Sequence, residues 1–547
     1  MKKKILMLML SCGIFISAIA QQESTLAASF DKIINEELAL NGAGATVLVG
    51  RHGEIIYNKA FGLANVELNV PMKTDNVFRI GSITKQFTAI AILQLMEQGK
   101  LNLQDEITRF IPDYPMQGAK ITIEHLLTHT SGIRDYTSLR DTVQRGKIDF
   151  TPEAMIDYFK NQPMRFEPGD RYEYSNSNYF LLGYIIEKIT GNTYQQYLVK
   201  NIFKPLDMHD SYVGKDTMII KNRAAGYSMG GVQIENAAIL SMTHPYAAGA
   251  ILSTTKDLFK WNEAVQSYKL VKKETLEKAL TRYKLNNGKE INYGYGFRLG
   301  FIQESPSIWH GGRINGFITT AMCLTHEEVF VVILSNCDCN DVDRVSAKLA
   351  ALAIGKPYDY KEIEVPNSIL QRYAGVYENE AGDPFVISVE NGQLFAQRGR
   401  NPRTLVKALT PNKFFFDDPM IMMEFHESME RQVDQLIIRS RSGNESWNKT
   451  DKLALIDNTI QVDEEILEMY TGEYEMTPQF AFTITREKQQ LFLQATDQDK
   501  LEMFAETENK FFLKVNDARF EFVNESGRIT KVIMRQGGRT AEAMKIK

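Results

Sequence analysis

The sequence predicts an α+β fold in which an antiparallel sheet flanked by helices is followed by two small all-β domains. Two observations lead to this prediction. Strand-like segments lie near both ends of residues 21–360, with helical patterns between them, which is typical of one sheet closed by distant parts of a chain. Residues 361–547 instead contain short runs of alternating apolar and polar residues, arranged as two similar copies.

The first 20 residues are typical of a secretory signal peptide. Lysines precede an apolar run at residues 5–19, and small residues before Ala20 fit a cleavage site. The run is shorter than the roughly 20 apolar residues that a membrane-spanning helix needs, and serines and a glycine interrupt it. We therefore expect cleavage near Ala20, a periplasmic or secreted mature protein and no stable membrane span.

Hydrophobic patterning predicts the elements of the domain at 21–360. Apolar residues on every face of 87–96 predict a buried helix, and Gly99 fits its C-terminal cap. Residues 102–268 are rich in helical patterns and are expected to form an inserted helical region. The other expected elements are a helix at 30–40, strands at 45–50, 54–61, 293–301, 307–311, 317–324 and 329–335, and a closing helix at 345–355.

The last part of the chain contains an internal duplication with an offset of 97 residues, the separation of Tyr373 from Tyr470. The residues of the first copy that recur at this offset are Tyr373, Gly375, Tyr377, Leu394, Phe395, Gln397, Asn412, Lys413, Phe414, Phe415, Glu424 and Phe425. We predict all-β domains at 361–457 and 458–547, with aromatic residues filling their cores. A structural or lid-forming role is favoured over a dedicated ligand pocket.

The composition limits the classes of function that the chain can have. The chain of 547 residues has a formal net charge of −5 and lacks the basic footprint of a nucleic-acid-binding protein. Loss of the signal peptide would leave Cys323, Cys337 and Cys339, an odd number whose pairing the sequence leaves open. Cys337 and Cys339 could form a local disulfide or a metal clip, but strand-end thiols without a catalytic role are the favoured interpretation.

Ser82-Ile83-Thr84-Lys85 is the most informative motif of the chain. Residues three apart share a helix face, so the Lys85 amine can reach the Ser82 hydroxyl. A free serine is a poor nucleophile near neutral pH, and a neighbouring base converts it into a good one. Free backbone N–H groups at the start of the buried helix would also favour a developing oxyanion. The alternative is an ordinary N-cap serine with a solvated lysine.

Two further motifs follow along the chain. Tyr174-Ser175-Asn176 lies between a turn-rich segment and an apolar helix, and His310-Gly311-Gly312 lies among strand-like runs. The order S-x-x-K, Y-x-N, H-x-G resembles the penicillin-recognising serine hydrolases, which include class C β-lactamases, serine DD-peptidases, D-aminopeptidases and related esterases. Segments 62–65 and 126–132 also resemble this family, and the resemblance covers roughly 30–355. It implies a β-lactamase/transpeptidase-like fold, and the repeats resemble lipocalin-like barrels appended to some D-aminopeptidase-type hydrolases.

The resemblance implies catalytic roles for three of these residues. Ser82 would attack a carbonyl carbon and form an acyl-enzyme. Lys85 and Tyr174 would share the proton transfers. Which of the two acts as the base stays open, because either a neutral lysine or an ionised tyrosine would serve and the pair can titrate as a unit.

The resemblance also implies substrate-binding roles. The backbone N–H groups of Ser82 and Arg313 would form the oxyanion hole. Asn176 would hold the substrate amide and the lysine. Gly311 and Gly312 would allow close approach of the substrate to their strand.

His310 occupies the place where β-lactamases usually carry the lysine of K-T-G, which is more similar to DD-peptidases, D-aminopeptidases and esterases. It could orient a substrate carboxylate and help to relay a proton, with a charge that depends on pH in the physiological range. A packed histidine at a strand start is the alternative. His125 and His129 have the i, i+4 spacing of zinc ligands but lack the H-E-x-x-H order, so we expect no metal and no cofactor.

These observations predict an exported serine hydrolase. Its expected substrates are D-amino-acid-containing peptides such as cell-wall fragments, or small amides and esters. The alternatives are a β-lactamase that hydrolyses β-lactam antibiotics, or a non-catalytic receptor that senses a ligand. Loop shapes around the site decide between peptidase and esterase, and the sequence does not reveal them.

Overall fold

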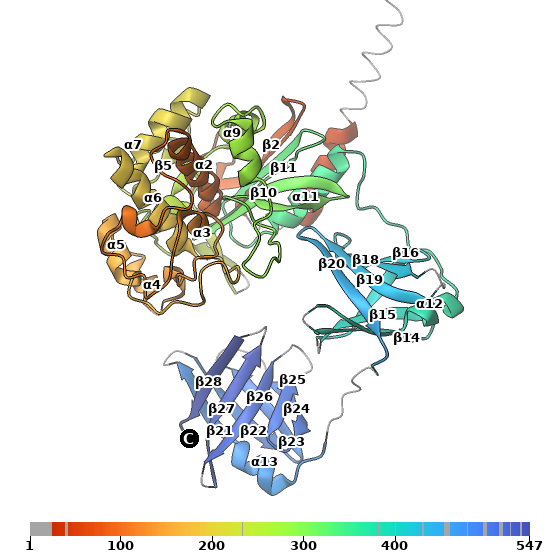
Figure 1. Ribbon diagram of the computed structural model, residues 1–547. Coiled ribbons are helices and arrows are strands. Elements are labelled where there is room, and N and C mark those ends of the chain that lie inside the picture. Colours follow the sequence, from red (N-terminus) through yellow and green to blue (C-terminus); the bar gives the residue numbers. More distant parts are fainter. Residues whose placement is uncertain are drawn as a thin grey trace, which may run out of the picture. The chain divides into compact units, whose positions relative to one another are not determined.

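The computed structural model is shown in Figure 1. It describes residues 25–38, 42–139, 141–231, 233–380, 382–399, 401–428, 432–452, 460–477, 480–495, 500–513, 518–525, 527–536 and 539–547. The predicted signal peptide and its cleavage near Ala20 therefore lie outside the described residues. In these ranges no helix has both the length and the apolar character that crossing a membrane requires. The chain divides near Tyr358 into two compact units, which are described separately below.

A seven-stranded antiparallel sheet forms the centre of the first unit, in the order β3-β2-β1-β12-β11-β10-β9. Its strands are β1 (Gly44–Arg51), β2 (Glu54–Asn65), β3 (Val70–Pro71), β9 (Arg298–Ile302), β10 (Ser305–Ile314), β11 (Phe317–Leu324) and β12 (Val329–Ser335). Pairing of β1 with β12 places Ala45 opposite Ser335, so the two ends of the domain close one sheet. The predicted α+β fold is confirmed.

Helices cover this sheet. Helices α9 (Thr255–Gln266) and α11 (Val342–Ala353) both pack on β12, whose seven residues are all buried. A strand buried on both faces requires the continuous apolar run that this segment carries. The predicted N-terminal helix spans residues 25–37, and one hydrophobic core joins the sheet to the helical region.

Two long helices dominate the helical region, α2 (Thr84–Glu97) and α6 (Asn176–Thr190), and they pack against each other. Helix α2 is buried on almost every face, as the largely apolar residues 87–96 predict. The shorter helices are η2 (Ile107–Arg109), α3 (Ile123–Leu127), η3 (Tyr136–Ser138), α4 (Thr142–Arg145), α5 (Pro152–Phe159), α7 (Tyr194–Leu198), η4 (Val199–Phe203), η5 (Lys204–Leu206), α8 (Tyr246–Gly249) and α10 (Lys273–Ala279).

The structure corrects two expectations about these segments. Residues 102–268 also contain short strands, namely β5 (Tyr212–Val213), β6 (Tyr227–Gly230), β7 (Gln233–Asn236) and β8 (Ile251–Ser253), which are too short to show a period of two. The strand expected at 293–301 begins only at Arg298, because the chain first turns against α2. Gly296 makes this turn with φ of 79°, and a Cβ there would lie 2.8 Å from the Lys85 carbonyl oxygen.

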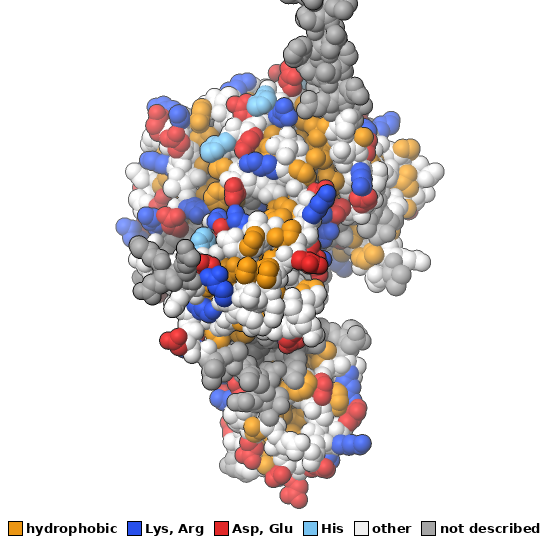
Figure 2. Space-filling model, turned by 90° about the vertical axis from the view of Figure 1, so that its right-hand side faces the viewer, with side chains coloured by type: hydrophobic (Ala, Val, Ile, Leu, Met, Phe, Trp, Pro, Cys, Tyr) orange, Lys and Arg blue, Asp and Glu red, His pale blue; other side chains and the backbone are white. Residues whose placement is uncertain are grey.

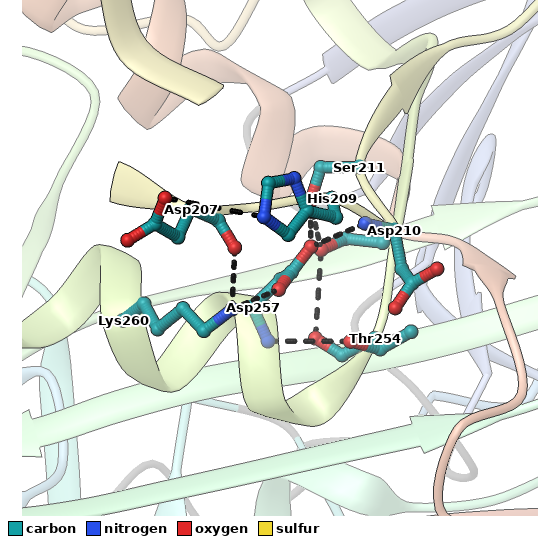
Figure 3. A network of polar contacts seen from close by, with 8 residues as sticks. Asp207, His209, Asp210, Ser211, Thr254, Asp257 and Lys260 are labelled. Carbon is teal, nitrogen blue, oxygen red and sulfur yellow. Dashed lines mark hydrogen bonds and ion pairs between the residues drawn. The ribbon is translucent and has the colours of Figure 1, made fainter. Parts of the chain in front are cut away.

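A buried carboxylate anchors the start of α9, and Figure 3 shows its contacts. The Asp257 carboxylate accepts hydrogen bonds from the Asp210 backbone N–H and the Ser211 hydroxyl, each at 2.9 Å, and from Lys260 at 3.1 Å. Thr254 caps the helix by accepting from the Asp257 backbone N–H at 3.2 Å. These partners satisfy the buried charge, so this cluster fixes the turn before β5 to the helix.

The second unit contains two closed eight-stranded barrels, which confirms the predicted pair of all-β domains. The first consists of β13 (Gly375–Glu378), β14 (Pro384–Glu390), β15 (Gln393–Arg398), β16 (Thr404–Thr410), β17 (Lys413–Phe415), β18 (Met422–Glu427), β19 (Val433–Ser440) and β20 (Gly443–Thr450), with α12 (Asn367–Tyr373) before it. The second consists of β21 (Gly472–Thr477), β22 (Phe480–Glu487), β23 (Gln490–Ala495), β24 (Leu501–Thr507), β25 (Lys510–Leu513), β26 (Arg519–Glu525), β27 (Arg528–Gln536) and β28 (Arg539–Lys545), with α13 (Glu464–Tyr470) before it.

The duplicated residues make the same contacts in both barrels. Tyr373 stacks on Phe425 with ring centroids 4.1 Å apart, and Tyr470 stacks on Phe522 at the same distance. The Tyr377 hydroxyl donates to the Tyr373 carbonyl at 2.8 Å, and the hydroxyl of the matching residue in the second barrel donates to the Tyr470 carbonyl at 2.8 Å. Aromatic side chains fill each core, as expected from the sequence.

Candidate active site

The Ser82 hydroxyl lies at the junction of a sheet and a helix. Ser82 belongs to the 3₁₀ turn η1 (Gly81–Ile83), which leads from β4 (Phe78–Arg79) into α2. The serine therefore lies in the turn before the helix and not in its first α-helical turn. Gly81 makes the bend with φ of 51°, a conformation that glycine adopts at little cost.

Lys85 is buried and contacts three oxygen atoms. Its side-chain amine is 3.1 Å from Ser82 Oγ, 2.8 Å from Asn176 Oδ1 and 2.8 Å from the Ala248 carbonyl oxygen. Burial lowers the pKa of Lys85 to about 7, although the negative charge of Asp135 opposes this shift. A substantial fraction of the amine is therefore neutral at neutral pH.

The three contacts determine the direction in which the lone pair of the neutral amine points. A neutral amine has two N–H donors and one lone pair. The Asn176 amide oxygen and the Ala248 carbonyl can only accept, so they take the two N–H groups. The lone pair then faces the Ser82 hydroxyl, which can donate to it. This arrangement suits the removal of a proton from the serine.

Tyr174 adjoins the same two groups but is not ionised near neutral pH. Burial raises the pKa of Tyr174 well above its usual range, and a hydrogen bond to Ser82 opposes this only in part. The Lys85 amine lies 4.8 Å from the centre of the Tyr174 ring. A protonated phenol beside the serine is suited to donate or relay a proton, and the lysine is suited to act as base.

Asn176 connects the lysine to a carboxylate. It is the first residue of α6, and its amide nitrogen donates to Asp135 at 3.1 Å while its oxygen accepts from Lys85. The two partners fix this orientation of the amide. The ionised Asp135 carboxylate can only accept hydrogen bonds, and the charged Lys85 ammonium can only donate them. Asp135 thereby positions the side chain that holds Lys85.

His310 is buried beside the Tyr174 ring and belongs to a chain of hydrogen bonds. Its Nδ1 is 2.6 Å from the Gly311 carbonyl and its Nε2 is 3.1 Å from the Tyr293 hydroxyl, while His129 Nε2 lies 3.3 Å from that same hydroxyl. The Ser175 backbone N–H donates to His129 Nδ1 at 3.1 Å. Burial and nearby positive charges hold the pKa of both histidines well below their usual range.

These contacts are compatible with one direction of proton donation along the chain. His129 accepts at Nδ1, so as a neutral ring it donates from Nε2 to Tyr293. Tyr293 can then donate to His310 Nε2, and in that tautomer His310 donates from Nδ1 to the Gly311 carbonyl. The sequence suggested that His310 faces the substrate with a charge that depends on pH. His310 is instead 1% exposed and neutral near pH 7. The reason is that the residue points into the aromatic cluster of Tyr174 and Tyr293.

Strand β10 approaches the serine turn closely enough to exclude side chains. A Cβ on Gly312 would lie 2.0 Å from the Ile80 carbonyl oxygen, and a Cβ on Gly81 would lie 3.0 Å from the Arg313 backbone nitrogen. Gly311 is less constrained, since its Cβ would meet only Asp343, at 3.3 Å. The backbone of Arg313 thus lies beside the turn of the serine, where the oxyanion hole was expected.

The space in front of the serine is a pocket of about 320 Å³. Its lining includes Ser82, Asn176, Ile239, Leu240, Ala248 and Arg313. A mainly apolar surface interspersed with polar groups is typical of sites that bind small ligands. The pocket therefore presents the serine hydroxyl to a ligand while Lys85 and His310 remain buried.

The remaining candidate residues have structural partners. His125 completes a capping box with Thr122 at the start of α3, and His129 belongs to the chain described above. Cys337 and Cys339 form a disulfide with a Cα–Cα distance of 5.2 Å, and Cys323 is free and buried. The favoured expectation of unpaired strand-end thiols was therefore wrong for this pair, while the open alternative of a local disulfide is found.

Comparison with known proteins identifies the fold. The Beta-lactamase family model matches residues 30–356, more than half of the chain. The chain belongs to the beta-lactamase family. A domain of unknown function, DUF3471, matches residues 457–546, which include the second barrel.

Relatives of this family include penicillin-binding proteins and an amidase. Penicillin-binding protein 4* of Bacillus subtilis (strain 168) is 29% identical over 421 residues, covering 72% of this chain and 91% of that protein. The octameric penicillin-binding protein homologue from Pyrococcus abyssi has a TM-score of 0.54 and 26% identity, covering 77% of this chain and 99% of that one. The D-amino acid amidase from Ochrobactrum anthropi SV3, complexed with D-phenylalanine, has a TM-score of 0.54 and 25% identity, covering 60% and 99%. The chain is accordingly an enzyme of the serine hydrolase type.

Sequence reasoning brought Ser82, Lys85, Tyr174 and Asn176 together, and the structure places them side by side. It missed Tyr293 and the Ala248 carbonyl. Tyr293 lies in the aromatic and glycine-rich run Tyr293-Gly294-Tyr295-Gly296, which could have marked a turn against a neighbour. A backbone carbonyl leaves no signal in a sequence.

Proposed function

We propose that this protein is an exported serine hydrolase that forms an acyl-enzyme on Ser82 and acts on D-amino-acid-containing peptides, or on small amides and esters. One observation carries the proposal. The buried Lys85 amine, with a pKa of about 7, has two acceptors for its N–H groups, and its remaining hydrogen-bond partner among the described residues is the serine hydroxyl, which can meet its lone pair. This is the arrangement that an activated serine requires.

Acylation follows from this geometry. Ser82 Oγ attacks the substrate carbonyl carbon, and its proton passes to the neutral Lys85. The carbonyl oxygen becomes an oxyanion held by the backbone N–H groups of Ser82 and Arg313. When the intermediate collapses, the Tyr174 hydroxyl gives its proton to the leaving amine or alcohol and is reprotonated by the Lys85 ammonium. The lysine is neutral again, and the acyl group remains on Ser82 as an ester.

Deacylation uses the same groups in the reverse direction. A water molecule attacks the ester carbonyl while Lys85 takes its proton. The oxyanion occupies the same hole, and collapse returns the proton to Ser82 as the acid leaves. The high pKa of Tyr174 restores the phenol to its protonated form after it donates, and Lys85 is the base in both half-reactions.

The substrate class rests on the relatives and on the third motif. Penicillin-binding proteins and a D-amino acid amidase are similar to this chain over most of their length. The third motif has His310-Gly311-Gly312 in place of K-T-G, which favours a peptidase, amidase or esterase over a dedicated β-lactamase. The pocket of about 320 Å³ suits a small acyl group such as one amino acid residue.

Export is supported by the predicted signal peptide and by the Cys337–Cys339 disulfide, because disulfides persist mainly in oxidising compartments. N-terminal sequencing of the protein recovered from the periplasm or the medium tests this. A mature chain that begins near Gln21 is expected. Recovery only from the cytoplasm with Met1 retained would contradict export.

The activity is tested by intact mass and turnover together. Wild-type protein and Ser82→Ala are incubated with a penicillin, with D-alanine p-nitroanilide and with p-nitrophenyl acetate. We expect Ser82-dependent turnover of the anilide or the acetate ester, with a stable penicillin adduct if the enzyme is DD-peptidase-like.

The other outcomes identify the alternatives. Hydrolysis of the penicillin itself, without an accumulating adduct, would indicate a β-lactamase. Absence of both adduct and turnover, with a biological response that survives Ser82→Ala, would indicate a non-catalytic receptor and would contradict the proposal.

A further inference from the structure

A second pocket, of about 360 Å³, adjoins the catalytic pocket. Residues 238–240 and Asn315 line both pockets and so contribute to the wall between them. Arg79, Arg223 and Asp216 supply the charged groups of the second pocket, which we name the arginine pocket. Arg79 ends strand β4, which leads directly into the turn of the catalytic serine.

The charges of the arginine pocket are not balanced. Two arginines and one aspartate line it, and Asp216 Oδ1 lies 3.6 Å from the Arg79 side chain, too far for a good hydrogen bond. The Arg79 side chain is only 17% exposed. Burial lowers the pKa of Arg79, the charge of Asp216 opposes this shift, and the like charge of Arg223 adds to it. Burial therefore raises the energy of the charged Arg79 side chain, which a bound anion would lower, and the exposed Arg223 adds a second guanidinium to the same pocket.

The donors of both arginines are available. Throughout the part of the chain that the structure describes, neither guanidinium donates a hydrogen bond to another residue. Each carries five N–H donors in a planar fork that matches the two oxygens of a carboxylate or phosphate. A lysine would offer a point charge instead, so this pair of residues is suited to a planar or tetrahedral anion.

The charge of the catalytic pocket also favours an anionic ligand. Its charged lining residues are Lys147 and Arg313, and both are basic. The chain as a whole has a net charge of −5, and the face drawn in Figure 2 mixes acidic and basic side chains. A local excess of positive charge in an acidic protein concentrates anionic substrates and favours their binding.

We propose that the arginine pocket binds an anionic group, a carboxylate or a phosphate, carried by the substrate at a distance from the bond that Ser82 attacks. The inference rests on the proposed function, because it assigns a substrate class to the same site. Arg79 and Arg223 hold the anion, and the shared wall at 238–240 carries the part of the substrate that connects it to the reacting carbonyl.

The test compares matched p-nitrophenyl esters. One series has straight acyl chains of increasing length that end in a carboxylate, a second ends in a phosphonate, and a third ends in a methyl group. The wild type should prefer the anionic esters at the chain length that spans the two pockets, by on the order of tenfold in kcat/KM. In Arg223→Gln this preference should disappear, and in Arg79→Lys it should weaken because the fork is lost. Lys221→Gln, an exposed lysine that lines neither pocket, should keep the wild-type preference.

The outcomes separate this inference from the proposed function. Turnover of the methyl-ended esters by Ser82 supports the proposed function whatever the charge preference. Equal kcat/KM for charged and uncharged esters at every length, or a preference that Arg223→Gln retains, would overturn the arginine pocket. Should no ester be hydrolysed, calorimetric titration of glutarate and of inorganic phosphate decides. Binding by the wild type that Arg223→Gln lacks supports the pocket, and no binding overturns it.

Discussion

The catalytic domain and the barrels both bury tyrosines, but they give them different neighbours. Tyr174 and Tyr293 lie against Lys85, His129 and His310, all of which carry exchangeable protons. The buried tyrosines of the two barrels, in contrast, donate to backbone carbonyls and stack on phenylalanines. Burial shifts the pKa of tyrosines upward in both regions. The comparison teaches that burial alone does not make a reactive site; the neighbours must be able to exchange protons.

The largest expected effect is the loss of the buried base. Lys85→Met should reduce kcat/KM by about 10³-fold or more, since it removes the proton acceptor of Ser82. Replacing the buried lysine by an apolar side chain of similar length should leave the fold intact, as circular dichroism would show. The measurement is ester hydrolysis at pH 8.

The matched control is a lysine of the first barrel. Lys449 lies 5.7 Å from the centre of the Tyr377 ring, and burial lowers its pKa as well, but its amine donates to a backbone carbonyl. Lys449→Met should therefore leave kcat/KM unchanged. A similar loss of activity in both variants would contradict the distinction between the two regions.

A substitution in a barrel core should lower the stability of the barrel without changing the rate of ester hydrolysis. Phe522→Ala should lower the free energy of unfolding of the second barrel by about 3–5 kcal/mol, because the ring is buried against Tyr470 and Phe511. Calorimetry of the full chain should show a transition at lower temperature. Ester hydrolysis below that transition should match the wild type, and a parallel fall in kcat would show that the barrel contributes to the reaction.

A smaller effect is expected from the hydrogen-bonded chain of His129, Tyr293 and His310. Tyr293→Phe removes the hydroxyl that joins His129 to His310, and we expect a loss of roughly tenfold in kcat with little change in KM. The ¹⁵N chemical shifts of the two histidines should report loss of their fixed tautomers. Tyr474→Phe, which removes a buried hydroxyl of the second barrel, should cost about 1 kcal/mol of stability and leave both histidine signals unchanged.

The smallest expected effect is a shift of the pH profile by less than about one unit. Activity should rise with pH as Lys85, with its pKa of about 7, loses its proton. The charge of Asp135 raises this pKa and that of Arg298 lowers it. Asp135→Asn should therefore move the acidic limb of kcat/KM to lower pH, and Arg298→Gln should move it to higher pH. Shifts of the same sign in both variants would exclude Lys85 as the titrating group.

The sequence predicted the parts of this site that local spacing determines. The S-x-x-K spacing places Lys85 beside Ser82 because both lie within one turn of the chain. The repeat offset predicted two equivalent domains because identical residues occupy identical places in each barrel. In both cases the information lies in residues close together or in copies of one pattern.

What the sequence could not predict depends on contacts between distant segments. The Ala248 carbonyl completes the lysine site from α8, and a backbone atom leaves no trace in residue type. The burial of His310 depends on Tyr293, which reaches it from the turn before β9. The local disulfide was left open because the spacing of Cys337 and Cys339 permits pairing but does not require it.

The close approach of β10 to the serine turn has a consequence for mutational tolerance. Gly312 contributes no functional group, yet any side chain there would collide with the Ile80 carbonyl oxygen 2.0 Å away. In a saturation scan of the gene, codon 312 should therefore tolerate as little change as codon 82. Mutational sensitivity alone would therefore not distinguish this glycine from Ser82, although Gly312 matters only because it has no side chain.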